Sequence, residues 1–349
     1  MSLLLRVLRH ADEARHLSPL DWDLLVRQCR HANLLGRLHQ RLEAAGVAMP
    51  ERARNHLLSG TIMAEQQHHS IRREVGHLRD ALSEIGLPLI LLKGAAYVAA
   101  GLPAAAGRLF ADVDILVPHA RLGEAESALM LTGWQSTALD AYDQRYYRRW
   151  MHELPAMQHM FRGTALDVHH TILPPTSRLK PDARLLIEAS VEIPGLPGVR
   201  TLALPDLILH SAAHLFHEGE PDNLLRDLTD LDALLRQLGE APAAWDALAG
   251  RAERTFELLV EYDLFAPLFP ASARALERDP DYTGDLIRQA LANTDERIAL
   301  GKPVTPAFLF AALLWPALPA RAAQLQERGM PPIPAMQEAA HDLIVEQCK

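Results

Sequence analysis

The sequence predicts an α+β protein that is mostly helical, in which a small α/β module is flanked by N-terminal and C-terminal helical domains. Three observations support this prediction. Leucines recur at helical spacing through residues 1–80, short apolar runs bounded by glycine and proline follow from Gly86, and helical patterns return from Pro205. With 349 residues, of which 49% are hydrophobic, the chain is long enough for more than one hydrophobic core.

Residues 1–80 are predicted to be helical. Apolar side chains recur at mixed spacings of three and four residues from Trp22 to Leu42, and the pattern ends at Gly46. Residues 51–85 continue as one or two further helices. The sequence of this region carries no obvious chemistry, so we interpret it as a scaffold.

Residues 81–204 differ in character and are predicted to form the α/β module. The apolar run from Pro88 to Leu92 is bounded by turn residues, which is typical of a buried strand. Arg162-Gly163-Thr164 separates two further runs and predicts a hairpin turn. In all, we expect strands at 88–92, 113–117, 133–137, 157–161 and 165–169, helices at 95–100 and 119–131, and a loop at 194–198.

The remainder of the chain is predicted to be almost entirely helical, as a domain over 205–254 and a tail over 255–349. Proline cannot continue the interior of a helix, so the prolines of this region mark expected helix ends. The expected helices are 205–218, 221–238, 243–264, 282–299, 305–326 and 335–348.

Composition and charge exclude several classes of protein. Cysteine occurs only as Cys29 and Cys348, so a disulfide framework or a cysteine-based zinc site is excluded and the cytoplasm is the expected compartment. The longest apolar run, 308–314, is far shorter than the ~20 residues that cross a bilayer. A net charge of −9 argues against a protein whose surface as a whole binds nucleic acid non-specifically, although it is compatible with a local basic groove.

Two acidic strands carry the strongest chemical signal. Side chains alternate along a strand, so Asp112 and Asp114 share one face while the apolar residues beside them share the buried face. Like charges this close are costly unless a cation lies between them, and acidic pairs select Mg²⁺ or Mn²⁺. On a later strand Asp167 and His169 alternate in the same way, and Asp167 completes a three-carboxylate cluster if the two strands are neighbours. For an isolated D-x-D, a solvated strand is the commoner explanation.

Lys93 and Gly94 stand between the first predicted strand and the helix that follows it. A helix N-terminus offers free N–H groups, glycine lets a phosphate approach the backbone, and lysine adds a positive charge. A plain turn is the alternative, because Lys-Gly after a strand is by itself a weak signal.

The helices after Pro205 carry polar residues with weaker interpretations. His210, His214 and His217 share one helical face, and we expect His210 or His214 to face the site rather than to bind zinc. Arg226, Asp227 and Asp230 are expected to form ion pairs on the helix surface or between domains, and Arg226 and Asp230 have the spacing of an i,i+4 ion pair.

The stretch from Tyr142 to Trp150 is both basic and aromatic. Arginine planes and aromatic rings suit bases and phosphates, so this stretch is a candidate for nucleotide or acceptor contact. Solvated surface or core packing is the more common explanation of such a pattern.

The combined pattern resembles the nucleotidyltransferase superfamily that includes DNA polymerase β, and more closely a bacterial family of uncharacterised nucleotidyltransferases. The resemblance covers roughly residues 15–250 and implies a small polymerase-β-like nucleotidyltransferase module. The matching segments are DWDLLVRQCRHANLLGRL (21–38), LLKGAA (91–96), GRLFADVDILV (107–117), GW (133–134), LDVHH (166–170), LALPDLILHSAAH (202–214) and LRDLTDLDALL (225–235).

The resemblance implies a site for a nucleoside triphosphate and a divalent metal, Mg²⁺ or Mn²⁺. The implied metal ligands, which are also the catalytic residues, are Asp112, Asp114 and Asp167. The implied nucleotide-binding residues are Lys93 and Gly94 of the phosphate-binding turn, Arg108 and His169.

A second resemblance covers residues 255–349. FELLVEYDLFAPLFPASARAL (256–276), YTGDLIRQALANTDERIALGKPVTPAFLFAALLWPAL (282–318) and ERGMPPIPAMQEAAHDLIVEQC (327–348) resemble the helical region behind the catalytic head of bacterial poly(A) polymerase I. That family's own catalytic motifs, GG-x-VRD and RRDFTINA, do not occur in this sequence, so a catalytic role falls to residues 86–170. The tail either presents an RNA acceptor, as the resemblance implies, or only packs against the rest of the chain.

Together these patterns predict a metal-dependent nucleotidyltransferase that moves a nucleoside monophosphate from NTP to an acceptor hydroxyl and releases pyrophosphate. The acceptor is an RNA 3′ end, a protein or a small molecule, and no membrane partner is expected. Two alternatives stay open: a catalytically silent nucleotide-binding or regulatory module, and a scaffold protein that keeps the fold.

Overall fold

The computed structural model describes residues 3–138, 140–176, 180–217 and 223–239, together with 244, 247, 248, 250–252 and 255. The helices predicted from 282 onward and nearly all of the tail lie outside these described residues. In the described part of the chain, none of the helices combines the length and the apolar character needed to cross a bilayer.

The N-terminal region is helical, as predicted. A capping box between Ser18 and Asp21 begins the second α-helix, and the residues predicted as one or two helices after Pro50 form a single helix of 33 residues. The elements are α1 (Leu3–Arg9), the 3-10 helix η1 (Ala11–His16), α2 (Pro19–His31), α3 (Leu35–Ala44) and α4 (Glu51–Ser83).

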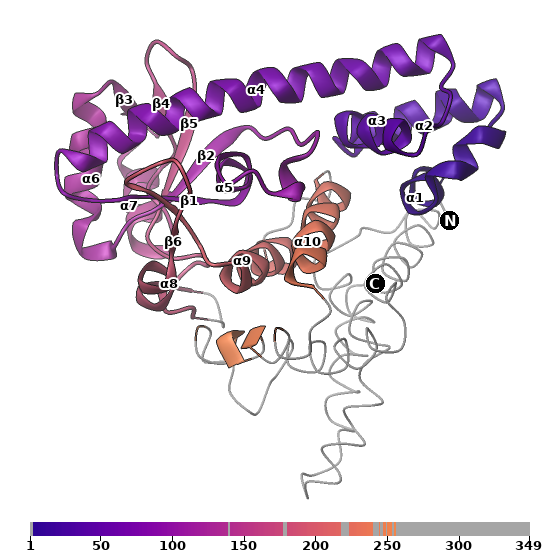
Figure 1. Ribbon diagram of the computed structural model, residues 1–349. Helices are drawn as coiled ribbons and strands as arrows, with labels where there is room; N and C mark the ends of the chain where they lie inside the picture. Colours follow the sequence, from indigo (N-terminus) through magenta and orange to yellow (C-terminus); the bar gives the residue numbers. More distant parts are fainter. Residues whose placement is uncertain are drawn as a thin grey trace, which may run out of the picture.

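Helix α4 connects two hydrophobic cores. It runs along the top of the molecule, from the N-terminal helices to the α/β module (Figure 1). Ala53 and Leu57 near its start pack in the core formed with α1–α3, whereas Val75 and Leu78 near its end pack in the core around the sheet. One continuous helix therefore fixes the position of the N-terminal region relative to the α/β module.

The sheet is mixed and has seven strands in the order β3-β4-β5-β2-β1-β7-β6. β2 is parallel to β5 and β1 is parallel to β7, while the other neighbouring pairs are antiparallel. The strands are β1 (Leu89–Leu92), β2 (Asp112–Leu116), β3 (Trp134–Ser136), β4 (Met157–His159), β5 (Ala165–His169), β6 (Val191–Glu192) and β7 (Val199–Thr201). The five predicted strands are confirmed. β6 and β7, on either side of the predicted loop, were not predicted because they are short and flank a stretch rich in proline and glycine.

Helices cover the sheet and complete the described part of the chain. They are α5 (Lys93–Ala99), η2 (Pro103–Ala105), η3 (His119–Arg121), α6 (Leu122–Leu131), α7 (Ala141–Trp150), α8 (Ala183–Ala189), α9 (Leu204–His217) and α10 (Leu224–Leu238). α7 and α8 were not predicted as helices. The aromatic residues Tyr142, Tyr146 and Trp150 share one face of α7 but are exposed, so they form no buried apolar stripe. The start of α7 depends on the Asp140 side chain, which accepts a hydrogen bond from the Tyr142 amide at 2.6 Å.

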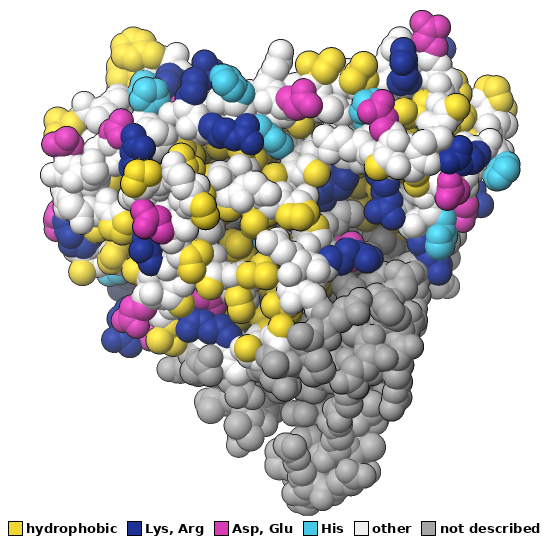
Figure 2. All heavy atoms as spheres, in the orientation of Figure 1, with side chains coloured by type: hydrophobic (Ala, Val, Ile, Leu, Met, Phe, Trp, Pro, Cys, Tyr) yellow, Lys and Arg dark blue, Asp and Glu magenta, His cyan; other side chains and the backbone are white. Residues whose placement is uncertain are grey.

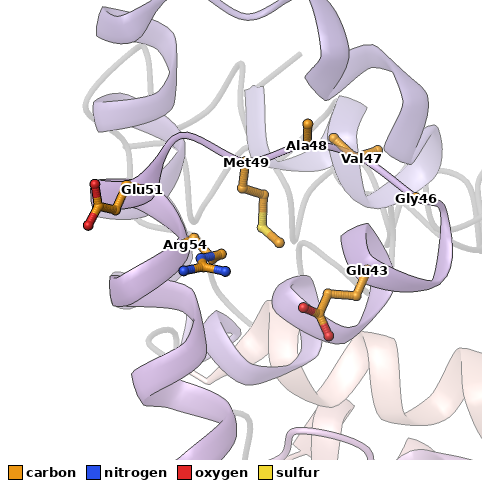
Figure 3. Close-up of a pocket in the computed structure, with 7 residues that line it drawn as sticks. All are labelled: Glu43, Gly46, Val47, Ala48, Met49, Glu51 and Arg54. Atoms are coloured by element: carbon orange, nitrogen blue, oxygen red, sulfur yellow. The ribbon is translucent and has the colours of Figure 1, made fainter.

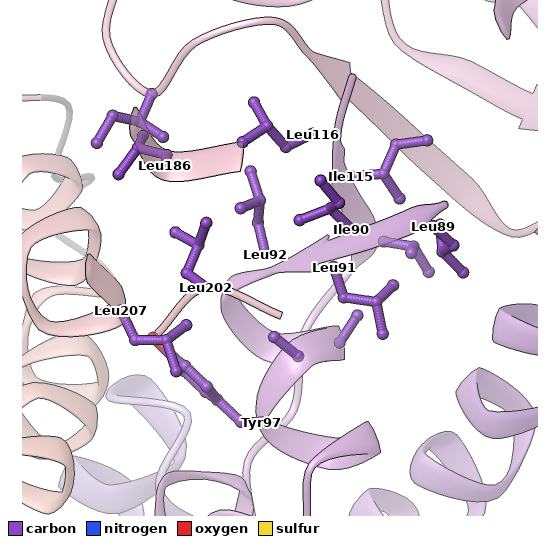
Figure 4. Packing of buried hydrophobic residues seen from close by; sticks show 14 of the residues in the cluster. Leu89, Ile90, Leu91, Leu92, Tyr97, Ile115, Leu116, Leu186, Leu202 and Leu207 are labelled. Carbon is purple, nitrogen blue, oxygen red and sulfur yellow. The ribbon is translucent and has the colours of Figure 1, made fainter. Parts of the chain in front are cut away.

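The core of the module lies around β1, whose four residues are all buried. Figure 4 shows Ile90 and Leu92 packed toward Leu116, with Leu207 of α9 beside Tyr97 of α5. α9 and α10 pack on each other and lie next to α5 (Figure 1). This arrangement places polar residues of the last two helices opposite the acidic strands.

Candidate active site

The two acidic strands, β2 and β5, are neighbours in the sheet and run parallel. Asp114 lies directly opposite Asp167, and Asp112 lies opposite Ala165. Residues in register on adjacent strands face the same side of a sheet, as do alternate residues of one strand. The sequence alone could not establish that these strands are neighbours. The structure does, and it brings the three predicted carboxylates together on one face.

The three carboxylates line a cleft of about 670 Å³. Asp114 is 4% exposed, whereas Asp112 and Asp167 are partly exposed. Side chains of α5, α9 and α10, of the segment before β2 and of the segment after α7 also reach the cleft, which makes it the candidate active site. The other lining residues are Lys93, Gly94, Tyr97, Arg108, Phe110, Ala111, Met151, His152, Glu153, Pro174, Ser211, His214, Asn223, Arg226, Asp227 and Asp230.

A second hollow, of about 740 Å³, lies at the turn between α3 and α4. Its carboxylates do not converge, because Glu43 and Glu51 lie on opposite sides of Met49 (Figure 3). Arg54 is the basic residue of its lining. The charged side chains that line this second hollow therefore do not form an acidic cluster like that of the cleft.

Lys93 contacts the acidic cluster directly. Its Nζ donates a hydrogen bond to Asp114 Oδ1 at 3.1 Å. The residue follows β1 immediately, begins α5 and has a positive φ of 43°, a conformation that is strained for a side chain with a Cβ. The predicted phosphate-binding lysine is therefore, in this structure, the partner of a carboxylate.

Gly94 is required for close packing. A Cβ at this position would lie 2.9 Å from the Phe110 ring and would collide with Nη1 of Arg108. Arg108 is 6% exposed and lies over the rings of Tyr97 and Phe110, with its guanidinium carbon 5.8 and 5.4 Å from their centroids. The glycine thus makes room for the arginine that precedes the acidic strand.

Two carboxylates of α10 hold Arg108. Its Nε donates to Asp230, and its Nη2 lies 3.7 Å from Asp227 Oδ1. Its Nη1 is buried and has no hydrogen-bond partner among the described residues. The predicted triphosphate contact of Arg108 is thus compatible only with this one nitrogen as the structure stands.

The i,i+4 ion pair between Arg226 and Asp230 is not formed, whereas the alternative that Asp230 pairs with residues outside its own helix is confirmed. Arg226 pairs instead with its neighbour Asp227 at 2.8 Å, and Asp230 accepts from Arg37 of α3 at 2.7 Å. Asp230 is 2% exposed and points toward α3 and the acidic strand. Its ion pairs are therefore with residues distant in sequence rather than with residues of its own helix. Arg37 was not singled out in the sequence, because nothing in its local pattern indicates a distant partner.

His169 is 1% exposed and does not line the cleft. Its Nε2 lies 3.0 Å from Asp114 Oδ1 and 3.3 Å from Glu153 Oε2. The residue that we assigned to nucleotide binding therefore lies behind the carboxylates and contacts one of them. Glu153 and His152 were missed by sequence analysis, because only the pairing of their segment with β5 places them there.

Burial and charge separate the three carboxylates. Burial alone would raise the pKa of Asp114, but the charge of Lys93 and the hydrogen bond with His169 outweigh it, and the pKa is lowered. Burial and the nearby charge of Asp114 raise the pKa of Asp112. Burial, together with the charges of Asp114 and Asp112, raises the pKa of Asp167 to about 7. Repulsion among these groups is what a divalent cation would relieve.

Two histidines of α9 approach the site. His214 lines the cleft, as predicted for one of the pair, and burial together with the charge of Lys93 lowers its pKa to about 3. His210 is 2% exposed. The side chain of His217 lies outside the described residues, so our expectation that this helix does not bind zinc stays untested.

The basic and aromatic stretch forms the exposed helix α7, which ends just before the cleft-lining residues Met151–Glu153. Tyr142 and Tyr146 stack with ring centroids 6.4 Å apart, and Trp150 follows at 5.8 Å from Tyr146. Burial and the charges of Glu153 and Asp167 raise the pKa of Tyr147 in this helix.

Comparison with known proteins supports both resemblances. Residues 18–258 match the model of a family described as "uncharacterised nucleotidyltransferase". This stretch is well over half of the 349-residue chain and contains every predicted site residue. No solved structure matches the chain significantly.

Part of the chain is also similar to poly(A) polymerase I. The enzyme of Escherichia coli strain CFT073 is 41% identical over 103 residues, which are 29% of this chain and 22% of the relative. The enzyme of Salmonella typhimurium is 40% identical over 103 residues, with the same coverage. That of Haemophilus influenzae is 42% identical over 82 residues, 23% of this chain and 18% of the relative. The chain therefore spans about a fifth of the length of these curated relatives.

Proposed function

The chain belongs to the uncharacterised nucleotidyltransferase family, and from that premise we propose that it transfers a nucleoside monophosphate from NTP to an acceptor hydroxyl in a metal-dependent reaction. The observation that carries the proposal is the register of β2 and β5, which sets Asp114 opposite Asp167 with Asp112 on the same face. Three carboxylates in one cleft beside a lysine and an arginine are suited to a triphosphate and its counter-ions.

The residues present fit a divalent cation. Two of the three carboxylates have raised pKa values because they are buried near other negative charges. We propose that Asp112, Asp114 and Asp167 hold Mg²⁺ or Mn²⁺, because hard oxygen ligands suit these ions. When bound, such an ion would offset the negative charge of the triphosphate and of the developing transition state.

In the proposed reaction the acceptor oxygen attacks the α-phosphorus of the nucleotide. The bond from the α-phosphorus to the oxygen that bridges it to the β-phosphorus breaks, and pyrophosphate leaves. Asp167, which lines the cleft opposite Asp114, is proposed to accept the proton of the acceptor hydroxyl. Asp114 stays ionised because Lys93 and His169 hold it.

Arg108 supports binding of the phosphates. Its buried Nη1 is next to Gly94 and has no partner among the described residues, so it has a donor available for an anion. Lys93 contributes positive charge from its place beside Asp114, and burial does not neutralise it because Asp114 raises its pKa. These two residues set the expected position of the triphosphate on the α5 side of the cleft.

RNA is the first acceptor that we propose to test, and ATP the first nucleotide. The support is the similarity to proteins named poly(A) polymerase I. On the face shown in Figure 2, Lys and Arg side chains alternate with Asp and Glu side chains, so the acceptor contacts are expected within the cleft and along α7 rather than on that face. We propose a cytoplasmic location on the basis of the two cysteines.

A second candidate is a module that binds nucleotide without turnover. The observation that favours it is the pairing of the two basic residues of the cleft, because Lys93 is bound to Asp114 and Arg108 to Asp230. Before Lys93 or Arg108 can make full contact with a phosphate, its ion pair with Asp114 or Asp230 must break. This candidate predicts nucleotide binding without pyrophosphate release.

The test is a thermal-shift measurement on the full chain. Each NTP is added with Mg²⁺, Mn²⁺ or a chelator to the wild type, to the Asp112→Ala/Asp114→Ala variant and to Asp80→Ala as a control on the exposed surface of α4. A ligand that binds only the folded state raises apparent stability by RT ln(1 + [L]/Kd). A metal-dependent shift in the wild type and the control, lost in the double variant, is the expected result.

Pyrophosphate release then separates the two candidates. With RNA and the nucleotide that gives the largest shift, release by the wild type supports transfer. A shift without release over RNA, protein and small-molecule acceptors supports the silent module. No shift in either protein would reject both candidates in favour of a scaffold protein. Equal shifts in the wild type and the double variant would mean that nucleotide binds without Asp112 and Asp114, which would reject the proposed site.

A further inference from the structure

A second cluster of different chemistry lies beside the three carboxylates. It consists of His152 and Glu153, which follow α7, and of His169 at the end of β5. Glu153 and His169 form an antiparallel bridge. The backbone bonds from Leu154 N to Val168 O and from His170 N to His152 O, both 2.9 Å, continue this pairing. The main chain therefore fixes all three side chains relative to one another.

The spacing of the three side chains matches that of metal ligands. One donor atom from each of His152, Glu153 and His169 lies within 4.8 Å of the others. Glu153 Oε2 is 3.3 Å from His169 Nε2 and 3.9 Å from His152 Nε2. Tetrahedral ligands at about 2.1 Å from a metal lie about 3.4 Å apart, so small side-chain shifts would complete such a site.

The donor set differs from that of the carboxylate cluster. Two imidazole nitrogens and one carboxylate oxygen suit Zn²⁺ and related transition-metal ions, whereas Mg²⁺ prefers oxygen ligands alone. His152 and His169 are 4% and 1% exposed, and burial favours the neutral ring, which is the form that binds a metal. His152 and Glu153 line the cleft, so an ion can reach them from solvent.

Local charge also favours a cation. A single N–H on Nε2 of His169 faces two carboxylate oxygens, Asp114 Oδ1 at 3.0 Å and Glu153 Oε2 at 3.3 Å. The one hydrogen on Nε2 can form a good hydrogen bond with only one of these two oxygens, whereas a cation bound to Nε2 would attract both. With the rings neutral, Asp114 and Glu153 give a charge of −2 and Lys93 gives +1, so this group has a formal charge of −1.

We propose that His152, Glu153 and His169 bind one transition-metal ion of the Zn²⁺ class, at a site adjacent to and distinct from the Asp112–Asp114–Asp167 cluster. Asp114, whose Oδ1 is 3.0 Å from His169 Nε2, adjoins both sites. An ion at the proposed site fixes the segment that connects α7 to β4 and holds His169 behind Asp114. The proposal does not depend on the transfer reaction.

The test is metal binding by the full chain after removal of metals with a chelator. Zn²⁺ is titrated against a chromophoric competitor, and Co²⁺ is added separately because its visible absorption reports nitrogen ligands and coordination number. The variants are Glu153→Gln and His152→Asn, with His170→Gln as the matched control, since His170 is next to the cluster and bonds to the Met151 carbonyl. Asp112→Asn tests the separate carboxylate cluster. Thermal unfolding establishes that each variant is folded.

One Zn²⁺ per chain is expected for the wild type, for His170→Gln and for Asp112→Asn. Glu153→Gln and His152→Asn are expected to bind Zn²⁺ at least 100-fold more weakly and to lose the Co²⁺ spectrum. The proposal is overturned if the wild type binds no Zn²⁺, or if both variants bind it as the wild type does. Loss of Zn²⁺ only in Asp112→Asn would also overturn it, because the ion would then belong to the carboxylate cluster. None of these outcomes uses nucleotide, so the result is separate from that of the thermal-shift test.

Discussion

Asp114 and Asp167 lie directly opposite each other on the parallel strands β2 and β5, yet their surroundings drive their pKa values in opposite directions. Lys93 and His169 both contact Asp114 and keep it ionised. Asp167 has burial and two negative neighbours, which raise its pKa to about 7. Two carboxyl groups in register thus differ in how readily they are protonated, because their neighbours carry opposite charges.

The Lys93–Asp114 contact leads to a stability prediction. Lys93→Met removes the ammonium 3.1 Å from Asp114 Oδ1 and leaves a buried carboxylate without it, so the free energy of unfolding is expected to fall by about 3 kcal/mol. Mg²⁺ is expected to recover part of this loss by supplying positive charge at the cluster. Urea unfolding with and without Mg²⁺ measures both effects.

Lys180→Met is the control for that experiment, because Lys180 is exposed. Its free energy of unfolding is expected to stay within about 0.5 kcal/mol of the wild type. If Lys93→Met is as stable as the wild type, the ammonium does not stabilise Asp114 and the assignment of Lys93 is wrong.

Gly94 and Gly76 provide a matched pair of helical glycines. Gly94→Ala places a methyl group against Phe110 and Arg108, so we expect a loss of about 2 kcal/mol in stability and weaker nucleotide binding. Gly76→Ala, in α4, meets nothing within 4 Å and should stabilise the chain by about 0.5 kcal/mol through helix propensity. Thermal unfolding and the nucleotide-induced shift measure both variants. A Gly94→Ala variant that behaves like Gly76→Ala would show that the turn is not tightly packed.

Most of the fold could be predicted because its signals are local. The leucine spacing of residues 1–80, the apolar run of β1 and the alternation around Asp112 and Asp167 each depend on a few consecutive residues, and the corresponding elements are confirmed. β6 and β7 were missed because they are very short. α7 was missed because it lacks a buried apolar stripe. The domain boundaries that we predicted stay predictions.

The sequence predicted the carboxylates of the site but not the residues that contact them. Strand alternation places Asp112 and Asp114 correctly on one face, whereas the position of Asp167 beside them depends on the pairing of β2 with β5, which alternation does not specify. Arg37, Glu153 and the true partner of Asp230 depend on contacts between distant segments, and no local pattern specifies these. The sequence therefore indicated which side chains are charged. The packing of α3, α7 and α10 determines which of these charged side chains contact one another.

The buried pair of Arg108 and Asp230 is expected to show strong coupling. Arg108→Met alone leaves Asp230 and Asp227 buried with less compensation, which should cost about 3 kcal/mol or more. The double variant Arg108→Met/Asp230→Leu should lose less than the sum of the two single variants, with a coupling of about 1–3 kcal/mol. Urea unfolding of the four proteins of the cycle gives the value.

The exposed pair Arg27–Asp23 provides the reference cycle. Its atoms lie 3.0 Å apart at exposures of 66% and 63%, and its coupling is expected to be about 0.3–0.5 kcal/mol. Equal coupling in the two cycles would mean that burial of Arg108 adds nothing to its interaction with α10.

His214 makes the stability of the protein depend on pH. Burial first, and then the charge of Lys93, lower its folded-state pKa to about 3, against 6.5 for the unfolded chain. Between these values the unfolded state binds a proton that the folded state does not, so stability falls as pH drops below about 6.5. The loss from this residue is on the order of 1 kcal/mol per pH unit and levels off near pH 3.

The test compares the wild type with His214→Gln by urea unfolding between pH 5 and pH 8. Asp167, with its raised pKa, acts in the opposite direction over part of this range, but it is present in both proteins and cancels in their difference. The wild type should therefore lose stability more steeply than the variant below pH 6.5. His77→Gln is the control for the substitution itself, because that side chain is exposed on α4. Parallel curves for the wild type and His214→Gln would show that the His214 ring is protonated as easily in the folded chain as in the unfolded one, and that the cleft wall formed by α9 is open to water.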